Sequence, residues 1–148
     1  MTLFSLDVNV WLALSVEGHE HNLVAWKWMR NLPFGAQFIF CRYTQVGLLR
    51  LLTNSTIMGN RVLTLGQAWS VYDAWLGDPF VTFYPEPHVI DGEFRVVTQP
   101  FSSQHASKWV GDCWLVAFAQ ATQSNLVTFD KALHNFARKH GHAAVLPA

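Results

Sequence analysis

Three aspartates stand where their carboxylates could act together, although they lie far apart in the chain. Asp7 directly follows the apolar stretch Leu3–Leu6, and Asp130 directly follows the β-prone letters "LVTF". Asp112 lies in the opening turn of the strongest helical pattern, Ser107–Gln123. Two carboxylates about 4 Å apart repel by roughly 4 kcal/mol at an effective dielectric of about 20. Such a cluster persists at neutral pH only with a bound cation or a retained proton, and oxygen-only ligands suit Mg²⁺ or Mn²⁺.

Each aspartate also has a simpler interpretation. Aspartate is a common helix cap and turn residue, and Lys131–Lys139 has the pattern of a short helix that Asp130 would cap. The spacing alone does not bring the three carboxylates together. The order of the strands decides between a metal site and three separate caps.

The segments around these residues alternate between strand and helix patterns. Strands are predicted at Leu3–Leu6, "AQFIFC", "FVTFY", the letters before Asp130, and "AAVLP". Helices are predicted at Val10–Val16, within "EGHEHNLVAWKWMRNL" and "TQVGLLRLLTN", from Thr64, briefly between Pro85 and Pro100, at Ser107–Gln123 and at Lys131–Lys139. This alternation predicts a parallel sheet with helices on both faces. Because parallel strands end at one edge of a sheet, Asp7 and Asp130 are expected to meet there.

Particular residues are predicted to begin or line these helices. Thr44 is predicted to cap its helix, and Thr64 with Gln67 fits a capping box. Apolar stripes are predicted to include the following residues: Leu23, Trp26 and Met29; Val46, Leu49 and Leu52; Ala68, Val71, Trp75 and Leu76; Leu115, Val116 and Ala119.

Composition excludes several classes of protein. The chain has 148 residues, of which 51% are hydrophobic, and therefore suits one folded domain rather than a disordered tail. Ten basic and ten acidic residues cancel, so binding of nucleic acid would need a local patch or metal ions. Two cysteines predict no disulfide framework. Asp7 and Asn9 interrupt the apolar N-terminus, so we expect no signal peptide or membrane span and a soluble, cytoplasmic protein.

Four segments carry a resemblance to a known family: "LFSLDVNVWLAL", "TQVGLLRLLTN", "GDCWLVAFA" and "LVTFDKAL". In this order and at these separations, they resemble PIN-domain nucleases, and more narrowly the VapC-type toxins of toxin–antitoxin pairs. The resemblance covers essentially the whole chain and implies one PIN-like domain over residues 1–148. It implies a three-layer α/β/α sandwich with a central, mostly parallel sheet.

The same resemblance implies a function. It implies acidic residues that bind Mg²⁺ or Mn²⁺ and hydrolysis of an RNA phosphodiester by metal-activated water. It also implies a cognate VapB-like antitoxin and a homodimer. Seven tryptophans in a chain of this size independently favour self-association.

Residue by residue, Asp7, Asp112 and Asp130 occupy the acidic positions of the family, and Thr128 matches the hydroxyl of its T-x-D signature. Gln45 stands where most relatives have a glutamate. It is expected to face the aspartates and to set how strongly metal is held. Since glutamine adds no charge, a catalytically weak or silent PIN-like module that binds RNA or protein is the alternative.

Two further residues are candidates for the site. Asn9 is predicted to hydrogen-bond Asp7 or a bound water, with an ordinary turn as its alternative. Arg50 is predicted to contact phosphate or orient the aspartates, with an exposed helical arginine as its alternative.

Other chemistries have weaker support. The H-x-H pairs His19/His21 and His140/His142 have no further ligand at a familiar zinc spacing. Cys113 has no histidine partner for nucleophilic catalysis. A phosphatase of the haloacid-dehalogenase type needs a second aspartate where Asn9 stands.

Overall fold

The computed structural model describes residues Met1 to Ala148 and contains one five-stranded sheet with helices on both sides. The strands are β1 (Thr2–Leu6), β2 (Ala36–Phe40), β3 (Val81–Phe83), β4 (Asn125–Val127) and β5 (Ala144–Val145). The helices are α1 (Val8–Ser15), α2 (Asn22–Arg30), α3 (Arg42–Leu52), α4 (Ser55–Met58), α5 (Leu65–Leu76), α6 (Ile90–Thr98), α7 (Val110–Thr122) and α8 (Lys131–Lys139). Each predicted strand and helix is present, and α4 is an addition.

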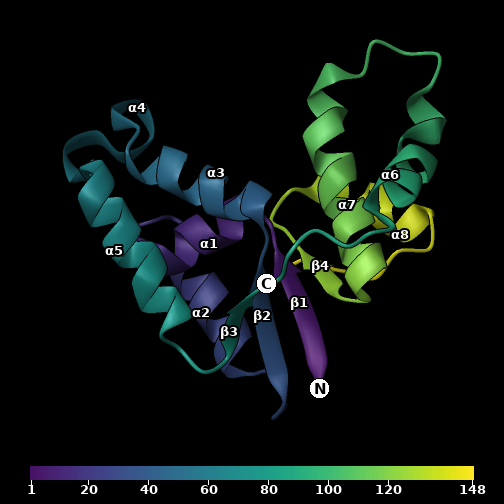
Figure 1. The fold of residues 1–148 in the computed structure, drawn as a ribbon. Helices are drawn as coiled ribbons and strands as arrows, with labels where there is room; N and C mark the ends of the chain where they lie inside the picture. Colours follow the sequence, from purple (N-terminus) through teal and green to yellow (C-terminus); the bar gives the residue numbers. More distant parts are fainter.

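The sheet is wholly parallel, in the order β3-β2-β1-β4-β5. Helices α1, α2, α3 and α5 pack on one face, and α6, α7 and α8 pack on the other (Figure 1). Strand alternation separates the two cores, because Phe38 and Phe40 join the first core while Ile39 joins the second. The predicted α/β/α sandwich is confirmed.

The strands end together at what we call the carboxyl edge of the sheet and begin at its amino edge. In the pairing of β1 with β4, Leu6 lies opposite Val127. The chain continues this pairing one step further, because the Asp7 N–H donates to the Val127 carbonyl at 2.8 Å. Asp7 and Thr128 therefore leave the sheet side by side at the carboxyl edge.

Two helices begin earlier than predicted. Helix α1 begins at Val8, not Val10, because the Asp7 side chain caps it. Helix α3 begins at Arg42, with Cys41 as its N-cap, so the predicted cap at Thr44 is wrong. Thr44 instead lies in the first turn, where its hydroxyl accepts the Cys41 N–H at 3.1 Å. The predicted capping box of Thr64 and Gln67 is confirmed.

Some residues of the predicted stripes face solvent. Leu23 is 81% exposed, and α2 buries Ala25 instead. Val46 is 45% exposed, since α3 packs through Gln45, Leu48, Leu49 and Leu52. No helix is both long enough and apolar enough to cross a bilayer.

Candidate active site

Asp7 is buried at the carboxyl edge and is held by two hydrogen bonds. Its Oδ1 accepts the Val8 N–H at 2.7 Å, and its Oδ2 accepts the Thr128 hydroxyl at 2.9 Å. Burial raises the pKa of the Asp7 carboxyl, the two hydrogen bonds oppose that rise, and the charge of Asp130 adds to it. The carboxylate is thus fixed in orientation but poorly solvated.

Thr128 links two of the aspartates. Its side chain is completely buried, and its Oγ1 accepts the Asp130 N–H at 3.0 Å while donating to Asp7. The Asp130 Oδ1 caps α8 by accepting the N–H groups of Ala132 and Leu133 at 2.9 and 3.1 Å. The simpler interpretation of Asp130 as a cap therefore holds, and its charge still reaches the other two aspartates.

Asp112 lies in the first turn of α7 and is half-buried. Its pKa is raised to about 6, first by burial and then by the charges of Asp7 and Asp130. Its carboxylate accepts no hydrogen bond from the protein, and none of the three aspartates forms an ion pair. The fold thus brings three mutually repelling carboxylates to one place, without a basic side chain to neutralise them.

This donor set suits an oxygen-liganded divalent cation. No group of three or more His, Cys, Asp or Glu side chains is placed to hold a metal ion by itself. Mg²⁺ does not need one, because it usually keeps several waters and binds through one or two carboxylates and substrate phosphates. Asp7 and Asp112 fit that requirement, because the charge of Asp7 adds to the rise in the pKa of Asp112.

Asn9 and Arg50 line an open groove of about 940 Å³ between α1 and α3, and none of the three aspartates lines it. Asn9 belongs to the first turn of α1 and is exposed. It does not hydrogen-bond Asp7, whose two oxygens accept from Val8 and Thr128. Arg50 is exposed and its charge lowers the pKa of Tyr43, so it lies near the site without pairing with an aspartate.

Gln45 is buried, and its contacts differ from the expected ones. Its Oε1 accepts a hydrogen bond from the Arg42 guanidinium, and it lies beside Tyr72 of α5. The Arg42 guanidinium also lies 4.7 Å from the ring centre of Phe83. Gln45 therefore hydrogen-bonds Arg42 and none of the three aspartates.

Comparison with known proteins identifies the family. The chain is 35% identical to ribonuclease VapC41 of Mycobacterium tuberculosis over 134 residues, which are 88% of this chain and 90% of that relative. The chain belongs to the VapC family. No protein-family model matches the sequence.

Solved VapC structures share the fold at low sequence identity. VapBC2 of Rickettsia felis, bound to a DNA fragment from its promoter, has a TM-score of 0.73 at 12% identity, over 99% of this chain and 100% of that chain. VapBC-1 of nontypeable Haemophilus influenzae has a TM-score of 0.69 at 13% identity, over 98% of both chains. VapC20 of M. tuberculosis, a sarcin–ricin loop cleaving toxin, has a TM-score of 0.67 at 16% identity, over 97% of this chain and 99% of that chain. The sandwich described above is thus the PIN-type fold of VapC proteins.

In this VapC chain, Tyr43 is a residue of the carboxyl edge that the sequence did not single out. It lies in the first turn of α3 and lines the groove with Asn9 and Arg50. Burial raises the pKa of its phenol, and the charges of Asp112 and Asp7 raise it further. A predicted start of α3 at Arg42 would have placed Tyr43 in the first turn of that helix, at the carboxyl edge.

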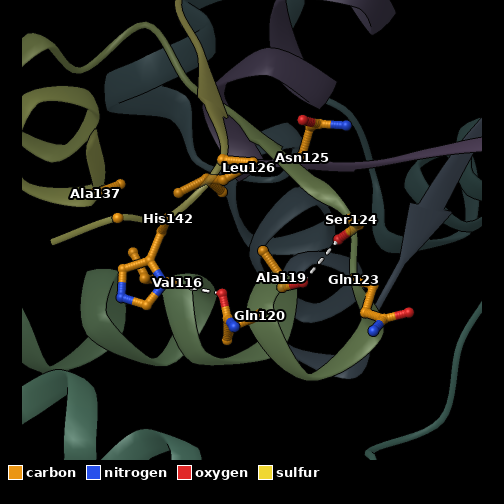
Figure 2. Close-up of a pocket in the computed structure, with 11 residues that line it drawn as sticks. Val116, Ala119, Gln120, Gln123, Ser124, Asn125, Leu126, Ala137 and His142 are labelled. Carbon is orange, nitrogen blue, oxygen red and sulfur yellow. Dashed lines mark hydrogen bonds between the residues drawn. The ribbon is translucent and has the colours of Figure 1, made fainter.

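A second region, at the amino edge, has a different character. A pocket of about 310 Å³ lies there, lined by Gln123 and Ser124 before β4 and by His142 before β5. Figure 2 shows His142 paired with Gln120, at 3.0 Å, and Ser124 turned toward the Ala119 carbonyl. The aspartates do not line this pocket.

The histidine pairs and Cys113 stay outside the acidic site. His19 accepts the His21 N–H, and the His21 ring stacks on Phe129 at 4.6 Å between centres. Cys113 is buried, and burial followed by the charge of Asp112 raises its thiol pKa to about 11. A thiol with that pKa is protonated at neutral pH and is a poor nucleophile.

Proposed function

We propose that this VapC protein is a metal-dependent endoribonuclease and the toxin of a toxin–antitoxin pair. The observation that carries the proposal is the cluster of Asp7, Asp112 and Asp130, in which burial and mutual charge raise the pKa of two carboxyls. The identity with ribonuclease VapC41 supports RNA as the substrate. A cation held at this cluster favours a polyanionic ligand there, which the carboxylates alone would repel.

Each carboxylate has a distinct part in this proposal. Mg²⁺ or Mn²⁺, bound through Asp7 and Asp112, would polarise the phosphate and lower the pKa of bound water. Asp7 keeps its orientation because Val8 and Thr128 hold both of its oxygens. Asp112 has no protein partner, so both of its oxygens are available to a ligand or to a proton. The Asp130 Oδ1 accepts hydrogen bonds from the first turn of α8, and its Oδ2 is free to bind a ligand in the site.

Arg42 and Arg50 line the groove that Tyr43 and Asn9 share and supply a local positive charge that the neutral composition lacks. Arginine side chains hold phosphates of the nucleic-acid backbone and so fix its position. We infer that the RNA backbone follows the groove toward the aspartates. Asn9, exposed on the same groove, is placed to contact the RNA or its water rather than Asp7.

Incubation of the purified protein with total RNA tests the proposal. Cleavage is expected with Mn²⁺ or Mg²⁺ and is expected to stop in excess EDTA. Mapping of the cut ends gives the RNA and the sequence preference. Full activity in EDTA contradicts the metal-dependent mechanism.

The second candidate function is a catalytically silent module that binds RNA or protein. The cluster has no fourth carboxylate, because Gln45 hydrogen-bonds Arg42 instead of joining the aspartates, and this favours the candidate. RNA that is bound by the protein but stays intact with Mn²⁺ over a range of pH would support it and exclude the nuclease.

A partner antitoxin and a homodimer complete the proposal. The VapBC2 and VapBC-1 structures that share this fold support a VapB-like partner, which would neutralise the toxin. Expression of the chain alone is expected to stop growth, and co-expression of the partner is expected to restore it. Light scattering at high micromolar concentration is expected to give the mass of a dimer.

A further inference from the structure

An aromatic row leads from the core to the acidic cluster. The Phe118 ring is buried and stacks on Trp114 with ring centres 5.4 Å apart and an angle of 16°. Trp114 in turn stacks on Tyr43 at 5.4 Å and 23°. Phe118 and Trp114 share one face of α7, whereas Tyr43 comes from α3. The row ends at Tyr43, which is 44% exposed.

Gly111 allows Tyr43 to lie where it does. A Cβ atom at position 111 would overlap the Tyr43 hydroxyl oxygen. Gly111 immediately precedes Asp112, so the phenol rests on the backbone beside that carboxylate. The Tyr43 hydroxyl makes no hydrogen bond within the protein, although Asp112 and Asp7 are near enough to raise its pKa.

The exposed side of Tyr43 belongs to the groove that also contains Arg42 and Arg50. The groove therefore presents two arginine residues and an exposed aromatic ring, and Gly111, on which that ring rests, immediately precedes Asp112. Single-stranded nucleic acid has complementary groups, because its phosphates pair with arginines while its bases stack on aromatic rings. A bound segment of another protein would not present a regular series of anionic groups and flat rings.

We propose that Tyr43 is a substrate-contact residue on which a nucleobase next to the cleaved bond stacks, as a further member of the row Phe118–Trp114–Tyr43. The inference rests on the proposed function and names how this site would hold the RNA. Trp114 and Gly111 fix the ring in advance, so little side-chain freedom is lost when the base arrives. Stacking tolerates any base but favours large ones, so Tyr43 contributes a preference at one position of the RNA.

The test measures binding of fluorescein-labelled 12-nucleotide oligomers of adenosine or uridine by fluorescence anisotropy. All variants carry Asp7→Asn to prevent cleavage. Replacement of the ring by Tyr43→Leu is expected to weaken binding about tenfold, the effect of removing one base–aromatic stack. Tyr43→Phe keeps the ring and is expected to bind like the parent. Phe34→Leu is the matched control, because Phe34 is fully exposed at the amino edge.

A second pair of variants tests the geometry without removing the ring. Gly111→Ala is expected to push the Tyr43 ring aside and weaken binding as Tyr43→Leu does. In the double variant with Tyr43→Phe, the oxygen is gone and the nearest ring carbon lies 3.1 Å from the new methyl group. Binding is expected to return in that double variant. A merely structural contact between α3 and α7 would change the melting temperatures but not this pattern of binding.

The outcomes separate the two proposals. If the unmodified protein neither binds nor cleaves RNA, both the proposed function and this inference are overturned. If it cleaves RNA while Tyr43→Leu binds the oligomers like Phe34→Leu, only the role of Tyr43 is overturned. A failure of Tyr43→Phe to restore binding in the Gly111→Ala variant overturns it as well.

Discussion

Both edges of the sheet bury polar side chains, but the amino edge pairs these groups with one another, whereas the carboxyl edge leaves Asp112 without a partner. At the amino edge, the Ser5 and Ser124 hydroxyls pair with each other, and His142 pairs with Gln120. Burial, with the neighbouring His140, lowers the pKa of His142, so this edge is neutral at pH 7. At the carboxyl edge, burial raises the pKa of Asp7 and Asp112, but no neutral or cationic partner for Asp112 is present.

The comparison teaches that burial alone does not make a functional site. Both edges disfavour charge, yet polar groups that satisfy one another need nothing from outside the protein. Carboxylates that repel one another are unfavourable in their charged form until they bind a cation or a proton. The difference between the edges therefore predicts where substitutions change chemistry and where they change only stability.

The largest effect is expected from Asp7→Asn at the carboxyl edge. RNA cleavage is expected to fall by at least about 100-fold, because even groups that only support metal ligands have effects up to that size. Asparagine caps helices as well as aspartate does, so the circular dichroism spectrum is expected to stay unchanged. Ser124→Ala at the amino edge is the control and is expected to cleave RNA like the wild type. Cleavage by Asp7→Asn at the wild-type rate would contradict the assignment of this edge.

Thr128→Val is expected to have the next largest effect. The substitution keeps the shape but leaves the Asp7 Oδ2 and the Asp130 N–H without a partner, at a cost of about 1–3 kcal/mol in unfolding free energy. Cleavage is expected to fall about 10–100-fold, as for other residues that orient metal ligands. Denaturant titration and cleavage rates measure the two effects.

Thr122→Val is the matched control for Thr128→Val, since the Thr122 hydroxyl bonds to the Phe118 carbonyl and to Ser124. Its loss is expected to lower stability slightly and to leave cleavage unchanged. Equal loss of cleavage in the two variants would show that the edges do not differ in function.

The Asp112→Asn variant tests, in metal-free buffer, the cost of ionising Asp112, which comes first from burial and then from the charges of Asp7 and Asp130. The Asp112 pKa of about 6 lies above its unfolded value, so the folded state binds more protons between about pH 4 and pH 6. The contribution of Asp112 to stability is therefore complete below about pH 4 and is lost as pH rises through about 6. Asp112→Asn removes that loss and, allowing for solvent screening of a half-exposed group, is expected to raise the melting temperature at pH 7.5 by roughly 2–4 °C.

At pH 4, the same variant is expected to have the melting temperature of the wild type. Addition of Mn²⁺ at pH 7.5 is expected to stabilise the wild type more than the variant. A melting temperature that Asp112→Asn leaves unchanged at pH 7.5 would mean that neither burial nor the other two carboxylates disfavour the charge of Asp112.

The smallest effect is expected from Gln45→Glu. A glutamate at this position would pair with Arg42 rather than face the aspartates. Metal affinity, measured by calorimetric titration, is therefore expected to stay near the wild-type value. A markedly tighter metal site would show that position 45 does reach the cluster, as the family pattern suggests.

The sequence was sufficient to predict much of the carboxyl edge. Strand ends in a parallel sheet must meet, so the approach of Asp7 and Asp130 follows from local patterns alone. Asp112 required only that its helix pack beside that edge. The strands themselves were identifiable because their short β-prone runs are separated by helical periodicity.

Which side chains of α3 point to the groove and which point to α5 was not predictable in the same way. A Cβ atom on Gly47 would lie 2.8 Å from a methyl group of Val8, so α3 approaches α1 closely at this glycine. That contact helps to direct Tyr43 and Arg50 to the groove and Gln45 toward α5. It joins residues of two helices, and no local pattern of α3 reveals it. The predicted cap at Thr44 was wrong for a related reason: a threonine in the first turn and a threonine at the cap can both hydrogen-bond to the backbone.

The hydrogen bond between Asp7 and Thr128 has a consequence for synthesis of the protein. The two residues are separated by 121 positions, and β4 must dock beside β1 before they can meet. A ribosome releases the N-terminal part first, so the nascent chain carries Asp7 for most of its translation without the partner that orients it. Products of premature termination before β4 lack Thr128 and Asp130 altogether. The cell is therefore exposed to a competent site only once translation of the toxin is nearly complete.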